Sequence, residues 1–168
     1  DNSMAKSIQF NSGAVSHVNG TDRFLPVGNT SNTLHSASEI YVSQIVRGEG
    51  FRVSNIQCYV KANTRTAGTG EIRLRKNNAD GNCVCLIPFG TTGLFVSTGG
   101  DTYAVADTIN YIVKWGVGGT GQIDFTSINC LINTATTNSI TRLVSYINSS
   151  IGIGTQYNQI VYKTLRTQ

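Results

Sequence analysis

The side chains able to do acid–base or nucleophilic chemistry are few in this sequence of 168 residues: two histidines, nine carboxylates and four cysteines. Catalysis of that kind needs several such groups close together, yet His17 and His35 both lie in the poorly patterned N-terminal third. The carboxylates are scattered over predicted turns and strands and form no recognisable glycosidase pair. The sequence therefore predicts no catalytic residues and no enzymatic activity.

The four cysteines, Cys58, Cys83, Cys85 and Cys130, each lie in a strand-like run. One residue separates Cys83 from Cys85, so an extended strand would point both sulfurs to the same face. Structural zinc usually takes paired ligands two or more residues apart at a turn. We therefore predict no metal site and interpret the cysteines as small buried apolar residues, with a cross-strand disulfide such as Cys58 with Cys130 as the alternative.

The Gly-rich run 116–121 contains Gly116, Gly118 and Gly121 at the spacing of a dinucleotide-binding fingerprint. That fingerprint needs a helix to begin at its third glycine. The residues that follow, 122–126, have the pattern of a strand instead. The run is predicted to be a hairpin loop, and the sequence predicts no cofactor.

The elements that would position any site are strands. The charged fraction is 13%, against roughly 25% in typical domains, and short β-branched and aromatic runs recur between Gly, Asn, Asp and Thr turns. The pattern predicts an all-β fold, a β-sandwich or barrel. The predicted strands are 7–10, 39–46, 51–61, 70–76, 83–87, 93–97, 102–105, 108–115, 122–132, 139–147 and 158–165.

Three segments are expected: an N-terminal arm (1–22), the sandwich (23–133) and a C-terminal strand extension (134–168). The arm is polar and sparsely patterned, and a Thr-rich linker begins the extension. We expect the extension to pack on the same domain or on a neighbouring subunit.

The candidate surface-binding or interface residues are Arg73, Arg75, Tyr103 and Trp115. Alternation in the strand 70–76 places Arg73 and Arg75 on one solvent or interface face. The aromatic residues are candidates for a sugar-stacking platform, although strand alternation also favours core positions for most of them. In the strand 108–115, Trp115 shares its face with three other apolar residues.

The net charge is +4, and the basic residues are not clustered around aromatic platforms, so no nucleic-acid partner is predicted. No window approaches the 18 apolar residues of a membrane helix, and no secretory signal is recognisable. Met4 and the residues after it resemble a natural translation start, and an initiator at Met4 predicts synthesis in a host cytoplasm. The alternative is a processed precursor that begins at Asp1.

Several runs resemble the small β-domains of bacteriophage structural proteins. They are 23–28, 51–56, 68–80, and Val105-Ala106-Asp107-Thr108-Ile109 followed by the Gly-rich turn 118–121, in which the family's usual Gly before Asp is missing. The resemblance covers 23–133. It implies a jelly-roll β-sandwich of two antiparallel sheets, akin to the tumour-necrosis-factor and complement-head trimers, and it brings no catalytic residue.

Together these observations predict a non-enzymatic virion structural protein, either a capsid decoration protein or a tail fibre or spike head. We expect a homotrimer, since trimerisation hides strand edges and apolar faces, with other virion proteins or a host-surface glycan as further partners. The alternatives are an extracellular glycan-binding module and a filament subunit that exchanges β-strands through its terminal segments.

Overall fold

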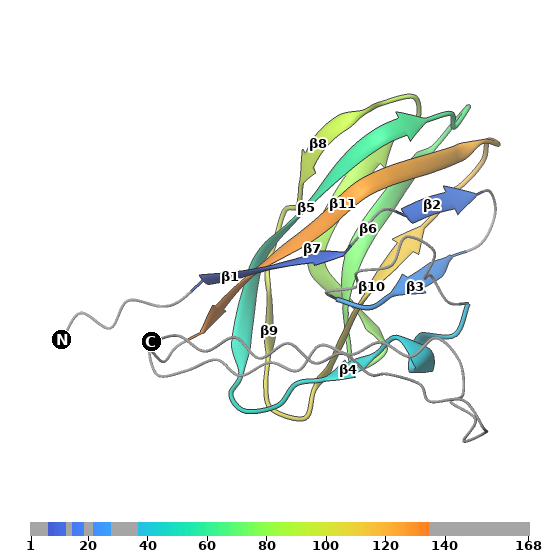
Figure 1. The fold of residues 1–168 in the computed structure, drawn as a ribbon. Helices are drawn as coiled ribbons and strands as arrows, with labels where there is room; N and C mark the ends of the chain where they lie inside the picture. The colour runs from blue at the N-terminus through green and yellow to red at the C-terminus, as the bar shows by residue number, and fades with distance from the viewer. Residues whose placement is uncertain (1–6, 13–14, 19–21, 28–36, 135–168) are drawn as a thin grey trace, which may run out of the picture.

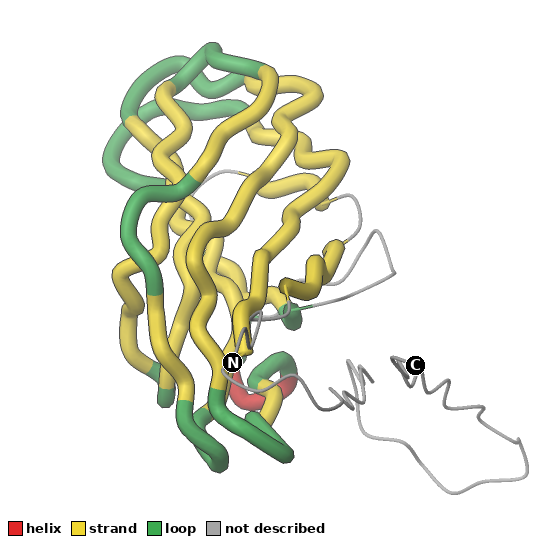
Figure 2. The backbone as a smooth tube through the Cα atoms, turned by 90° about the vertical axis from the view of Figure 1, so that its left-hand side faces the viewer, coloured by secondary structure: helices red, strands yellow, loops and turns green. Residues whose placement is uncertain are grey.

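The computed structural model describes residues 7–12, 15–18, 22–27 and 37–134 (Figure 1). These residues form two antiparallel sheets that face each other, and the predicted all-β sandwich is confirmed. The only helical element in the described ranges is a one-turn 3-10 helix, η1 (Glu39–Tyr41), which Figure 2 shows as the single red segment among strands and loops.

The six-stranded sheet, called sheet A, has the order β1-β11-β5-β8, with β2 also paired to β11 and β9 also paired to β5. Its strands are β1 (Ser7–Ser12), β2 (Val15–Val18), β5 (Phe51–Asn63), β8 (Gly93–Val96), β9 (Asp101–Tyr103) and β11 (Gln122–Thr134).

The five-stranded sheet, called sheet B, has the order β3-β10-β6-β7, with β4 also paired to β10. Its strands are β3 (Arg23–Leu25), β4 (Gln44–Ile45), β6 (Thr69–Lys76), β7 (Ala79–Pro88) and β10 (Thr108–Lys114).

The core lies between the sheets and follows the predicted alternation. In β6, Ile72 and Leu74 are buried while their neighbours Glu71, Arg73 and Arg75 are not. In β10, every residue from Ile109 to Val113 is buried, including the polar Asn110. Alternation on one strand therefore identified the core of β6 fully, but it missed that β10 is covered on both faces.

Two turns match the chemistry expected of their residues. Asn77 and Asn78 both have positive φ, 52° and 63°, which is the backbone of the two-residue type I′ turn that suits the twist of a hairpin. The Gly-rich run between β10 and β11 has positive φ at four of its glycines, and β11 follows it. The run is a loop between strands, as predicted, and does not lead into a helix.

One predicted strand, 39–46, is wrong over most of its length. Backbone N–H groups of Val42 and Ser43 both donate to the Glu39 carbonyl and close the turn of η1, so only Gln44 and Ile45 are left to pair with β10. The predicted N-terminal arm also contributes to the sandwich, because β1 and β2 pair with β11. The strands predicted at 139–147 and 158–165 lie outside the described residues.

All four cysteines are buried and have free thiols, as expected of small apolar core residues. The alternative disulfide between Cys58 and Cys130 is wrong for this structure. Register places Ile128 opposite Cys58 and Ile56 opposite Cys130, so the two cysteines are diagonal neighbours. Diagonal positions lie about 7–8 Å apart, too far for the roughly 3.5–4.5 Å between Cβ atoms that a disulfide needs.

Candidate functional site

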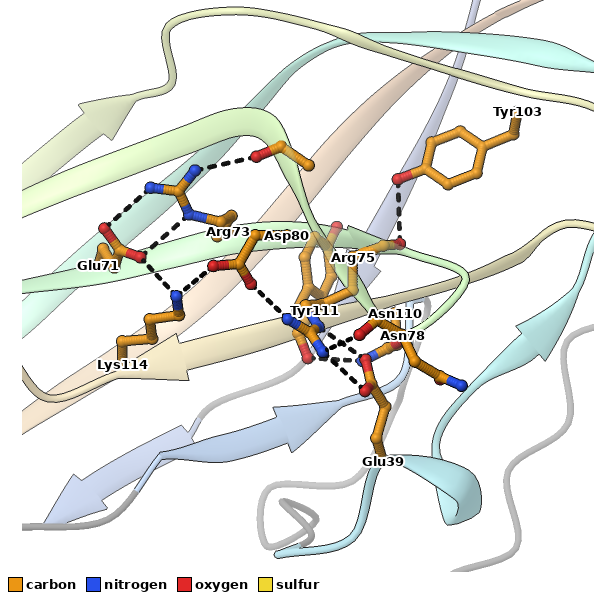
Figure 3. A network of polar contacts seen from close by, with 11 residues as sticks. Glu39, Glu71, Arg73, Arg75, Asn78, Asp80, Tyr103, Asn110, Tyr111 and Lys114 are labelled. Carbon is orange, nitrogen blue, oxygen red and sulfur yellow. Dashed lines mark hydrogen bonds and ion pairs between the residues drawn. The ribbon is translucent and has the colours of Figure 1, made fainter.

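Two of the predicted site residues, Arg73 and Arg75, lie in a network of charged side chains on the outer face of sheet B (Figure 3). Strand register brings the network together, because Lys114 of β10 lies opposite Glu71 of β6 and Asp80 of β7 lies opposite Arg75. We refer to the following six residues as the charged network: Glu39, Glu71, Arg73, Arg75, Asp80 and Lys114.

Arg75 is the centre of this network. Its Nε and Nη2 donate to the two carboxylate oxygens of Glu39 in η1, at 2.8 and 2.9 Å, and its Nη1 donates to Asp80. The bidentate pair fixes η1 against sheet B, and the bond to Asp80 spans the β6–β7 turn. Arg75 therefore holds three elements together.

Arg73 and Lys114 complete the network beside it. Arg73 donates to both oxygens of Glu71, at 3.0 and 3.2 Å, and to the carbonyl of Gly81 at 2.9 Å. Lys114 lies 3.6 Å from the nearer Glu71 oxygen and donates to Asp80. Every guanidinium or ammonium group of the network thus contacts a carboxylate of the network.

These contacts set the protonation of the groups. Hydrogen bonding to Glu71 raises the pKa of Arg73, and hydrogen bonding to Glu39 raises the pKa of Arg75. Partial burial acts to raise the pKa of Asp80, but hydrogen bonds from Lys114 and Arg75 outweigh it and hold that pKa below its usual value. Three carboxylates thus balance three cations, so the network offers no excess charge to an anionic ligand and serves to fix the fold.

The other two predicted site residues are not on the surface, and this part of the prediction is corrected. Tyr103 is 1% exposed and Trp115 is 5% exposed. Tyr103 belongs to the core between the sheets, and the Trp115 ring lies under a guanidinium group. The Tyr103 hydroxyl donates to the Arg75 carbonyl at 3.1 Å, and its ring lies 5.4 Å from that of Phe51. Neither ring can serve as a sugar-stacking platform in this structure.

Trp115 is covered by a residue that the sequence did not single out, Arg65. The Arg65 guanidinium lies 3.9 Å from the centre of the Trp115 ring, and its Nη2 donates to the Gly118 carbonyl at 3.2 Å. Its Nε and Nη1 are buried without a hydrogen-bond partner, and burial lowers its pKa. Arg65 links the Gly-rich loop to the loop before β6.

The outer face of sheet A carries an apolar surface that sequence reasoning also missed. Tyr59 of β5 lies directly opposite Leu94 of β8, and Val96 is two residues further along the same face. Tyr59 is 48% exposed, Leu94 64% and Val96 52%. We call these three residues the β8 patch. Three consecutive apolar residues at 94–96 are its sequence signal, because in a strand one of the two faces must then be exposed or covered by a partner.

The backbone of β8 is also open to a partner. The Ser97 N–H donates to the Ile56 carbonyl at 2.8 Å, and hydrogen-bonded positions alternate along an antiparallel strand. The N–H and C=O groups of Leu94 and Val96 therefore point away from β5. The bridge between Thr98 and Val84 of β7 lies two residues beyond the end of β8, and β8 is an edge strand of sheet A (Figure 1).

Among the residues that the structure describes, no three His, Cys, Asp or Glu side chains are grouped so as to hold a metal ion. The same residues contain no helix with the length and hydropathy needed to cross a membrane.

Comparison with protein-family models, with curated proteins and with solved structures finds no match to this chain.

Proposed function

We propose that the protein is a non-enzymatic virion structural protein, a capsid decoration protein or a tail fibre or spike head, that assembles into a homotrimer and adheres to neighbouring surfaces. The observation that carries this proposal is the β8 patch, an exposed apolar surface on the edge strand β8 and its neighbour β5 in sheet A. A protein that works by contact needs a surface whose burial stabilises association.

The composition of the edge supports association between copies. Natural proteins protect exposed edges with charged residues, Pro or bulges, but the segment 89–100 that contains β8 has no charged residue. Leu86 and Phe89, at the neighbouring edge of sheet B, are exposed as well. A second and third copy, each packing against the next in a closed ring, would cover this edge without bringing like charges together.

The order of the strands supports the jelly-roll part of the proposal. Where two consecutive strands pair with the same neighbour, as β1 and β2 do with β11, they act as one interrupted strand. Merged in this way, the chain has four strands in each sheet, the eight strands of a jelly roll. The segments that resemble bacteriophage structural domains, including 51–56 and 68–80, fall on β5 and on β6 with its turn.

Assembly is tested by introducing charge into the β8 patch. We expect the double variant Leu94→Lys, Val96→Lys to be monomeric by light scattering at tens of micromolar, because ammonium groups buried between copies would lose their hydration. Ile45→Lys is the matched control, since Ile45 is a similarly exposed apolar residue of β4 in sheet B. A double variant that is as oligomeric as the control would refute the role of the patch.

The virion assignment needs a separate test. Gradient-purified particles from a culture that expresses this chain should contain its peptides at a constant ratio to the major capsid protein. Peptides that stay at the top of the gradient with free protein would contradict a place in the particle, whatever the oligomeric state.

A further inference from the structure

Two of the buried thiols face each other across the core. Cys58 lies on β5 in sheet A and Cys85 lies on β7 in sheet B, and the Cys85 Sγ lies 3.8 Å from the carbonyl oxygen of Phe95, the residue that register places opposite Cys58. The Cys85 Sγ also donates to the carbonyl of Ile56, two residues from Cys58, at 3.4 Å. The side chain of Cys85 thus reaches the opposite sheet beside Cys58.

Strands β5 and β7 approach each other across the core. Facing sheets usually lie about 10 Å apart, and a disulfide needs Cα atoms roughly 4.4–6.8 Å apart. Cα atoms of β5 and β7 come within 8 Å of each other, nearer than typical sheet packing.

The other two cysteines have different surroundings. The Cys83 Sγ lies 3.1 Å from the Ser97 hydroxyl, and its backbone N–H donates to Asp101. Cys130 is the diagonal neighbour of Cys58 on β11. Of the two β7 sulfurs, that of Cys85 is therefore the one in contact with the residue opposite Cys58.

We propose that Cys58 and Cys85 are a modification site, a latent disulfide that joins the two sheets when the protein meets a peroxide. In the first step one thiolate attacks the O–O bond of hydrogen peroxide, which gives a sulfenic acid and releases hydroxide. In the second step the other thiol attacks the sulfenic sulfur, the S–S bond forms and water leaves. The two sulfurs lose two electrons, and the peroxide with two thiol protons becomes two waters.

Peroxide is a suitable oxidant for this site because it is small. Hydrogen bonding to Cys58, together with burial, raises the pKa of Cys85, so few thiolates exist in the folded protein and bulky thiol reagents cannot reach them. We expect oxidation to take hours and to leave the fold intact. The site lies inside one copy of the chain, so the inference is independent of the proposed assembly.

The test is peptide mapping of the folded, full-length chain after treatment with hydrogen peroxide, under non-reducing conditions. Trypsin places Cys58 in peptide 53–61 and Cys130 in 115–142, but it leaves Cys83 and Cys85 together in 77–114. The Cys83→Ala variant removes that ambiguity. We expect 53–61 to be joined to 77–114 within one chain, at the cost of two hydrogens, in both the unmodified protein and Cys83→Ala.

The oxidised protein should also melt at a higher temperature, by on the order of 10 °C, because the bond closes a loop in the unfolded chain. Cys85→Ala should lose both the cross-link and this shift, whereas Cys130→Ala, the matched control, should keep both. Cross-linking of 115–142 in place of 53–61, disulfides between chains, or higher oxides with no disulfide would each overturn the proposal. Where Cys83→Ala fails to fold, tandem mass spectrometry of the joined peptides from the unmodified protein decides the question, because fragmentation between Cys83 and Cys85 shows which of the two is linked to Cys58.

Discussion

Removal of the Arg75 guanidinium should destabilise the protein more than removal of any exposed charge. The side chains of Arg75 and Glu39 are each only 13% exposed, so Arg75→Met would leave a mostly buried carboxylate without its bidentate partner. A hydrogen bond to a charged group contributes roughly 1.5–3 kcal/mol, and breaking a fully buried ion pair costs about 3–5 kcal/mol. Partial exposure places the expected loss at about 2–3 kcal/mol.

Urea unfolding followed by tryptophan fluorescence measures this loss, since the single Trp115 is buried. Arg47→Met is the matched control, because Arg47 is exposed and surface changes usually alter stability by less than about 0.5 kcal/mol. A double-mutant cycle with Glu39→Gln should give a coupling of about 1–2 kcal/mol. If Arg75→Met cost no more than Arg47→Met, the network would not fix η1 to sheet B as we describe.

Three further results are expected. Asp101→Asn should cost about 1–3 kcal/mol in urea unfolding, because its carboxylate accepts two backbone N–H groups of β7 and an amide NH₂ would face one of them; an unchanged midpoint would contradict this. The pKa of Asp80 is lower when folded than when unfolded, so its contribution is fully present above about pH 4 and is lost as the pH falls through the folded value. The melting temperature should accordingly fall less steeply below pH 4 in Asp80→Asn than in the unmodified protein, and parallel curves would count against the role of Asp80. Gly116→Ala should cost more than Gly118→Ala by about 2 kcal/mol or more: both have φ near +80°, but only at Gly116 would the new Cβ lie 2.1 Å from the Thr69 carbonyl oxygen. Equal melting temperatures for the two alanine variants would show that this close approach is relaxed at little cost.

The sequence predicts the sandwich well where one local rule decides the outcome. Alternation identified the buried face of β6 because that strand has one face on the core and one on the charged network. It failed for 39–46, where the Glu39 side chain bonds to Arg75 on a strand far away in sequence and its carbonyl closes a turn. Neither contact has a signal within the segment itself.

The candidate site was only partly predictable for the same reason. Arg73 and Arg75 were placed on the correct face, but their carboxylate partners depend on the register between three strands. Tyr103 and Trp115 were candidates for a sugar-stacking platform because both are aromatic. The sequence alone does not show that the fold buries both side chains. The apolar run 94–96 indicates that one face of the strand must be exposed or covered by a partner. Predicting the β8 patch also requires knowing that β8 is an edge strand, which is a property of the order of strands.

The central claim, that this protein works by association between its own copies, is tested most directly by sedimentation equilibrium of the unmodified chain at tens of micromolar. For a homotrimer, we expect one species at three times the chain mass of 18.0 kDa. A single species at 18.0 kDa over the whole concentration range would contradict it.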